Sequence, residues 1–270
     1  MPFTPSHVAA VIPLVSSRAT RRVLDPWALA VGSMVPDLPM FLPYLTDYTG
    51  WHSPKGVVTT DVVAVMVLLA LFEFVFRDPL TALSPAPIAA RVAALPGPSW
   101  RRFPTIVLGA AVGAATHVFW DSFTHSWGAE FWGWSWMTAP VFGWLTGFRL
   151  MQYASSVAGL AVVAWWAARA LRSPAAAPGT NGARGRGGDG GEVSRPVLPV
   201  VVRRGVLAGT AVTACLASGL WTLVDPPNPA FGWAGVITKT GVGLLVGTCG
   251  ALTVYVLLWQ LARAIRLSRA

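Results

Sequence analysis

Long uncharged stretches recur along the chain and indicate helices that cross a membrane. Residues 150–168, 205–224 and 241–262 carry no formal charge, and residues 103–120 carry one histidine and no formal charge. A spanning helix needs about 20 predominantly apolar residues. The apolar runs are continuous rather than alternating, which favours spanning helices over a β-barrel.

The same pattern predicts an all-α fold, a polytopic bundle with about six to seven membrane helices. The first two helices are short or interrupted, the second of them by Pro36-Asp37-Leu38-Pro39. These two suit half-helices that are buried against the others, because protein then covers their backbone. The expected helices cover residues 6–17, 27–45, 57–76, 103–125, 150–168, 205–224 and 236–262.

Between the fifth and sixth helices, the pattern gives way to glycine, proline and arginine. Such a stretch lacks core-forming side chains and is typical of a flexible linker. We therefore expect three parts: a membrane bundle over residues 1–172, a cytoplasmic linker over residues 173–199 and a helix pair over residues 200–270. All four histidines fall in the first part.

Composition and charge agree with a membrane protein. Of the 270 residues, 54% are hydrophobic and 11% are charged, whereas soluble domains carry about 25% charged residues. The net charge of +9 need not mean nucleic-acid binding, because arginines gather in alternate loops and the positive-inside rule explains them. The rule predicts a multi-pass protein of the plasma (inner) membrane with its N-terminus outside and its C-terminus cytoplasmic. The first six residues lack the basic segment of a cleavable signal peptide, so we expect the N-terminus to be retained.

Tryptophans gather on the predicted outer side, where indole rings favour the headgroup level. We expect residues 129–147 to lie along this interface, either as an ordinary aromatic belt or as a cover over what lies beneath. The two cysteines, Cys215 and Cys249, fall in predicted spans and are interpreted as small packing residues.

The candidate chemistry centres on His117, Asp121 and His125, which form an H-x3-D-x3-H run. On a continuous helix these side chains share one face, and the two histidines lie about 12 Å apart along the axis. That distance is too long for one ion, so Asp121 is expected to bridge two metal positions. The simpler alternative is a hydrogen bond between His117 and Asp121 alone. Ionisable residues in apolar spans are nonetheless functional candidates.

Three more candidates, His7, Asp37 and His52, fall on the same predicted side of the membrane. Singly, His7 and His52 suit surface positions and Asp37 suits a helix cap or turn. Together the six residues form a nitrogen and carboxylate ligand set for zinc, with manganese or iron as alternatives. Asp61, at the start of the third helix, suits either a partner of a ligating histidine or an acid favoured by the helix dipole.

Three segments resemble a bacterial membrane family catalogued as domain of unknown function 4184. They are Met1-Pro-Phe-Thr-Pro-Ser-His7, Gly32-Ser-Met-Val-Pro-Asp37 and His117-x3-Asp121-x2-Thr124-His125. The resemblance covers most of the chain up to about Leu171 and carries no established activity.

A more distant similarity is to membrane-bound metal-dependent hydrolases and to zinc-dependent phospholipase C. The order of His7, Asp37, His52, His117, Asp121 and His125 matches the order of ligands in those proteins. The similarity implies metal-assisted hydrolysis of a phosphoester or ester. The chain departs from those proteins in lacking a later His-x3-Glu pair and in the shorter spacing from Asp121 to His125, which argues against a third metal.

The leading hypothesis is a two-metal hydrolase that faces outward and acts on a membrane lipid or another lipid-linked ester. Asp37 and Asp121 are the expected catalytic carboxylates. One ion would be held by Asp37, His52, His117 and Asp121, and the other by His7, Asp121 and His125. The alternatives are a non-enzymatic metal-binding or transport protein and a structural protein with incidental histidines. Polar residues that cluster on one side, without an internal repeat, favour the enzyme over a transporter.

Overall fold

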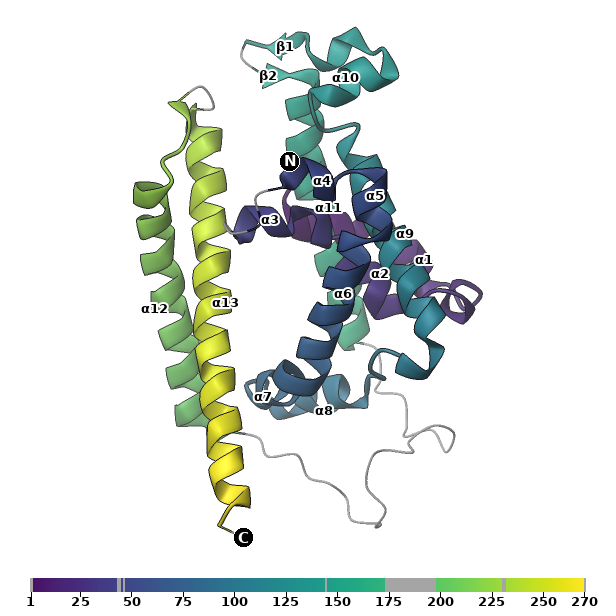
Figure 1. Ribbon diagram of the computed structural model, residues 1–270. Coiled ribbons are helices and arrows are strands. Elements are labelled where there is room, and N and C mark those ends of the chain that lie inside the picture. The colour runs from purple at the N-terminus through teal and green to yellow at the C-terminus, as the bar shows by residue number, and fades with distance from the viewer. Residues whose placement is uncertain are drawn as a thin grey trace. The chain divides into compact units, whose positions relative to one another are not determined.

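The structure, a computed structural model, describes residues 2–42, 45, 47–143, 145–172, 198–229 and 232–269 (Figure 1). These residues are almost entirely helical, with one short hairpin of strands β1 (Pro140–Phe142) and β2 (Leu145–Thr146). The longer α-helices are α1 (Val8–Ser16), α6 (Thr60–Leu71), α8 (Ala86–Ala94), α9 (Phe103–Asp121), α11 (Gly147–Arg172), α12 (Val200–Val224) and α13 (Gly232–Leu267). The shorter α-helices are α2 (Pro26–Gly32), α3 (Leu38–Phe41), α4 (Tyr48–Trp51), α5 (Pro54–Val58), α7 (Arg77–Ala82) and α10 (Trp127–Trp132). Single turns are η1 (Thr4–His7), η2 (Thr20–Arg22), η3 (Val35–Asp37), the π-helical η4 (Phe72–Phe76), η5 (Trp100–Arg102) and η6 (Ser135–Met137).

The predicted all-α membrane fold is confirmed. Among the described residues, four helical stretches are long and apolar enough to cross a membrane: Trp100–Asp121, Gly147–Arg172, Val200–Val224 and Gly232–Leu267. A shorter apolar stretch, Thr4–Ser16, accompanies them.

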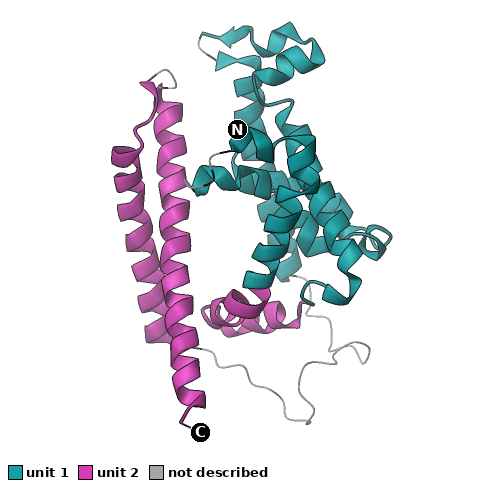
Figure 2. Cartoon of the chain, viewed as in Figure 1, with its two compact units in different colours: residues 1–71, 96–173 teal, residues 72–95, 174–270 magenta. Residues whose placement is uncertain are grey.

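The chain forms two compact units (Figure 2). The first contains Met1–Leu71 with Pro96–Ser173, and the second contains Phe72–Leu95 with Pro174–Ala270. Of the linker expected over residues 173–199, only Leu198 and Pro199 belong to the described residues, so that expectation lies mostly outside them.

Two predicted helices differ from those in the structure. The helix expected over residues 57–76 is divided into α5, α6 and η4, because Thr59 adopts a φ of −123° and a ψ of −80° between α5 and α6. The helix expected over residues 103–125 ends at Asp121, where the chain turns. Gly128 then packs so closely against Ser122 that a Cβ at Gly128 would lie 1.7 Å from the Ser122 carbonyl oxygen.

Close packing of α2 against α9 forms the framework of the first unit. Asp25 caps α2 by accepting hydrogen bonds from the backbone N–H groups of Trp27 and Ala28. Where the helices meet, a Cβ on Gly32 would lie 2.5 Å from the Ala110 carbonyl oxygen. Glycine is therefore required at this crossing, which brings the end of α2 against the middle of α9.

The second unit is organised around the hairpin of α12 and α13. Gly243 and Gly247 of α13 pack directly against the backbone of Ser218 and Ala214. The π-helical turn η4 leaves the Val75 carbonyl available, and Gln260 of α13 donates a hydrogen bond of 2.7 Å to it. A side chain of α13 thus compensates for the irregular backbone.

Candidate metal centre

The six residues proposed from the sequence meet in the first unit. His7 ends η1, Asp37 ends η3, and His52 follows α4. His117 and Asp121 lie on the last two turns of α9, and His125 lies in the turn after it. Each of the four histidines has a ring nitrogen within 3.7 Å of an oxygen of Asp37 or Asp121.

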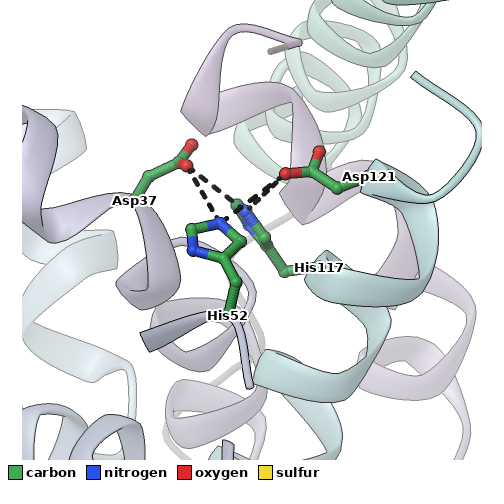
Figure 3. Close-up of side chains that lie close together, drawn as sticks. All are labelled: Asp37, His52, His117 and Asp121. Atoms are coloured by element: carbon green, nitrogen blue, oxygen red, sulfur yellow. Dashed lines mark ion pairs between the residues drawn. The ribbon is translucent and has the colours of Figure 1, made fainter. Parts of the chain in front are cut away.

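Four of these residues form a compact group (Figure 3). Asp37, His52, His117 and Asp121 each offer one ligand atom, and these atoms all lie within 4.8 Å of one another. His117 Nε2 lies 3.4 Å from Asp37 Oδ1 and 3.4 Å from Asp121 Oδ2, and His52 Nε2 lies 3.7 Å from the same two oxygens. Two imidazoles thus face two carboxylates from different segments.

Asp121 faces two groups of histidines with its two oxygens. Oδ2 faces His117 and His52, whereas Oδ1 lies 3.5 Å from His7 Nε2 and 3.7 Å from His125 Nδ1. One carboxylate therefore contacts both groups of histidines that the sequence analysis assigned to separate metal positions. The axial separation expected between His117 and His125 does not apply, because the helix ends at Asp121.

Backbone carbonyls orient the two rings of the compact group. His117 Nδ1 lies 2.9 Å from the Ser33 carbonyl oxygen, and His52 Nδ1 lies 3.0 Å from the Tyr48 carbonyl oxygen. In each pair Nδ1–H donates, so a neutral ring presents the lone pair of Nε2 to the carboxylates. Metal-binding histidines are commonly held in this way.

The buried charge of this group needs a cation. Asp37 and Asp121 are at most 1% exposed, and no lysine or arginine among the described residues pairs with either carboxylate. Buried carboxylates are stable only when they are paired or bind a metal. The group must therefore hold protons on its histidines or a positive ion between its ligands.

The four nitrogen–oxygen separations in the group suit ligands of one ion better than direct hydrogen bonds. Charge-assisted hydrogen bonds between nitrogen and oxygen measure about 2.7–2.9 Å, whereas the separations here are 3.4–3.7 Å. Ligands about 2.0–2.1 Å from a tetrahedral ion lie roughly 3.3 Å from one another. In addition, the Nε2 atoms of His52 and His117, Asp37 Oδ1 and Asp121 Oδ2 are buried without a hydrogen-bond partner among the described residues.

His7 completes the cluster beside this group. Its ring stacks on that of His117 with centroids 3.8 Å apart, and both of its nitrogens lack a hydrogen-bond partner among the described residues. Both nitrogens are therefore available to a ligand or a proton.

Sequence reasoning missed the role of Thr4. Its hydroxyl donates a buried hydrogen bond of 2.6 Å to Asp37 Oδ2, which leaves Oδ1 directed at the two histidines. Thr4 belongs to the opening motif, but no spacing rule connects a threonine to an aspartate 33 positions later. The Ser33 and Tyr48 carbonyls were also missed, because any residue type supplies a carbonyl.

Three other acids that the sequence places near the site, Asp61, Asp47 and Glu130, do not join the cluster of histidines and aspartates. Asp61 is fully buried in the first turn of α6, and neither of its oxygens has a hydrogen-bond partner among the described residues. It does not orient His52 or His117, whose Nδ1 atoms face carbonyls. Asp47 caps α4 by accepting a hydrogen bond from Gly50, and Glu130 is exposed on α10.

Fold and site together define a helical, membrane-type protein with a buried histidine and aspartate cluster that suits a divalent metal. The chain belongs to the family described as Domain of unknown function (DUF4184), whose model matches residues 1–257. The match extends well beyond Leu171, so the helix pair α12–α13 is largely included in the family domain. Neither a curated protein nor a solved structure matches the chain.

Proposed function

We propose that the protein is a metal-dependent hydrolase of the plasma membrane that acts on a phosphoester or ester. The observation that carries the proposal is the facing arrangement of one oxygen from each of two carboxylates with two Nε2 lone pairs, four buried atoms that lack hydrogen-bond partners among the described residues. The distant similarity to metal-dependent hydrolases and zinc-dependent phospholipase C supports the same proposal, because the candidate ligands follow one another in the same order along the sequence.

The cluster offers positions for two ions. The first is bounded by Asp37, His52, His117 and Asp121. The second is bounded by His7 Nε2 and Asp121 Oδ1. His125 lies beside them, but its Nδ1 donates a 3.0 Å hydrogen bond to the Asp121 backbone carbonyl, so only its Nε2 is free for an ion. Nitrogen and carboxylate ligands favour zinc, with manganese or iron as alternatives.

Divalent ions at such a site activate water and polarise the oxygen of the bond to be cleaved. The protein's own residues set the conditions for that chemistry. Asp121 connects the two positions, and Asp37 is held in place by Thr4. His7, Asp37, His117 and Asp121 are themselves buried, so the cluster has little contact with bulk water.

The arginine distribution supports an outward-facing site. Arg101 and Arg102 precede α9, whose other end carries Asp121, and Arg169 and Arg172 end α11. With these arginines in the cytoplasm, Asp121 and the N-terminus lie at the outer face and the C-terminus inside. At headgroup depth, a membrane lipid or another lipid-linked ester is the natural substrate. In this scheme the linker is cytoplasmic, and residues 1–172 carry the site.

Metal analysis of the purified full-length protein tests the proposal. Wild type, His117→Ala and Asp121→Asn are compared with Glu130→Gln, which removes an exposed acid outside the cluster. We expect bound metal in wild type and Glu130→Gln, and its loss in the other two. Asp121→Asn keeps the size of the side chain, so size-exclusion profiles separate metal loss from misfolding. Negligible metal in every sample would refute the proposal.

Hydrolysis is tested on the same samples with a chromogenic phosphodiester and a chromogenic ester. Turnover by wild type that falls with the metal in His117→Ala supports an enzyme. Metal-loaded protein that turns over neither compound but moves the ion across a proteoliposome membrane would favour the transport alternative.

A further inference from the structure

The segment between α9 and α11 carries an exposed aromatic surface. We define it as Trp127 and Phe131 of α10, Trp134 and Trp136 after it, and Phe142 of β1. These side chains are between 40% and 72% exposed. Exposed aromatic groups at this density are unusual on a surface that faces water and indicate an interaction surface.

The aromatic surface is an ordered structure. The rings of Trp132 and Trp134 stack with centroids 5.4 Å apart, and those of Trp134 and Trp136 stack at 6.2 Å. Trp132 Nε1 donates a 3.0 Å hydrogen bond to Ser122 Oγ, and Met137 is fully buried beneath the segment. The surface is therefore fixed to the end of α9, next to Asp121.

Its position follows from the helices that it connects. α9 ends at Asp121 and α11 begins at Gly147, and both are candidate spans, so residues 122–146 join two helix ends on one side of a bilayer. α10, β1 and β2 lie together at these ends (Figure 1). Within residues 122–148, Glu130 is the one formally charged side chain.

We propose that the aromatic surface lies in the lipid headgroup layer and holds the metal centre at that depth. Tryptophan suits this layer because its ring is apolar and its N–H reaches polar groups. The centre is adjacent, since the His125 and Trp127 rings stack with centroids 6.4 Å apart. The proposal deepens the proposed function, because it gives the structural basis for the headgroup depth on which the lipid substrate rests. Its evidence is the candidate spans and the exposed rings, so the depth measurement and the metal analysis fail separately.

Spin-label depth measurements test the proposal. The native cysteines Cys215 and Cys249 are replaced by alanine, and labels are placed through Phe131→Cys and Phe142→Cys in full-length protein in phosphatidylcholine–phosphatidylglycerol nanodiscs. The control is Lys55→Cys, an exposed charged position in α5 outside the aromatic surface. Collisions with oxygen, which partitions into lipid, are compared with collisions with a water-soluble nickel chelate.

We expect a higher ratio of oxygen to nickel collisions at positions 131 and 142 than at position 55. Equal ratios at the three positions would overturn the proposal. Low access to both reagents at 131 and 142 would also overturn it, because the surface would then cover the centre or contact a second copy. Metal content measured on the same variants reports separately on the metal centre.

Discussion

Asp121 Oδ2 lies 3.4 Å from His117 Nε2, one turn earlier on α9, while Asp121 Oδ1 lies 3.5 Å from Nε2 of His7, which is 114 positions earlier in the sequence. A single carboxylate at a helix end therefore joins the N-terminal turn to the α9 ligands. This relationship makes Asp121 the residue whose loss should affect the whole cluster.

The number of bound ions should follow this arrangement. Under the two-ion proposal, His7→Ala is expected to lose one of two ions, because the described carboxylate oxygen that His7 faces is Asp121 Oδ1 and not an oxygen of the four-residue group. Asp121→Asn should lose both, since it weakens each position. Elemental analysis per mole of protein measures the ratio. Equal losses in the two variants would contradict separate positions.

Thr4→Val should weaken metal binding while leaving the fold intact. The change removes the hydrogen bond that positions Asp37, and loss of such outer hydrogen bonds typically reduces metal affinity about 10–100-fold. Thr4→Ser keeps the hydroxyl and should remain close to wild type. Competition with a chromogenic chelator gives the affinities. A valine variant that binds as tightly as wild type would show that Asp37 needs no such support.

Gly113→Ala should destabilise the protein. A Cβ at this position would lie 2.4 Å from the Leu29 carbonyl oxygen, so α2 and α9 would have to separate. Overpacking of this kind costs about 1–3 kcal/mol. The matched control is Gly209→Ala on α12, where a Cβ meets nothing within 4 Å and alanine favours the helix by about 0.5–1 kcal/mol.

Thermal unfolding in detergent measures both glycine variants. We expect a lower midpoint for Gly113→Ala and an unchanged or higher midpoint for Gly209→Ala. Similar midpoints would show that α2 and α9 are not held in close contact.

Metal removal should destabilise wild type and spare Asp121→Asn. A ligand that binds only the folded state stabilises it by about 2.7 kcal/mol at a concentration 100 times its Kd. Excess chelator should therefore lower the unfolding midpoint of wild type, whereas the variant has no bound metal to lose. A chelator effect of the same size on both proteins would point to sites outside the cluster.

The sequence predicted the helical fold well because uninterrupted apolar runs specify spanning helices with little ambiguity. It predicted helix ends less well. Nothing in the apolar pattern marks Asp121 as the last residue of α9, and the turn that follows depends on tertiary packing of Gly128 against Ser122. The hairpin of β1 and β2 was also missed, because strands this short have no recognisable pattern.

The candidate ligands could be predicted from the sequence because ionisable side chains are rare in apolar segments. The contacts that support these ligands could not be predicted. The Ser33 carbonyl reaches His117 only because Gly113 allows α2 to approach α9. Such contacts depend on the backbone arrangement, which residue types alone do not specify.

The central claim is that Asp37, His52, His117 and Asp121 hold a metal ion. The most direct test is an anomalous-difference map from crystals of the purified protein, recorded above and below the absorption edge of the metal found by elemental analysis. We predict a peak about 2.0–2.2 Å from the Nε2 atoms of His52 and His117 and from a carboxylate oxygen. A well-ordered cluster without any anomalous peak, in protein purified without chelator, would contradict it.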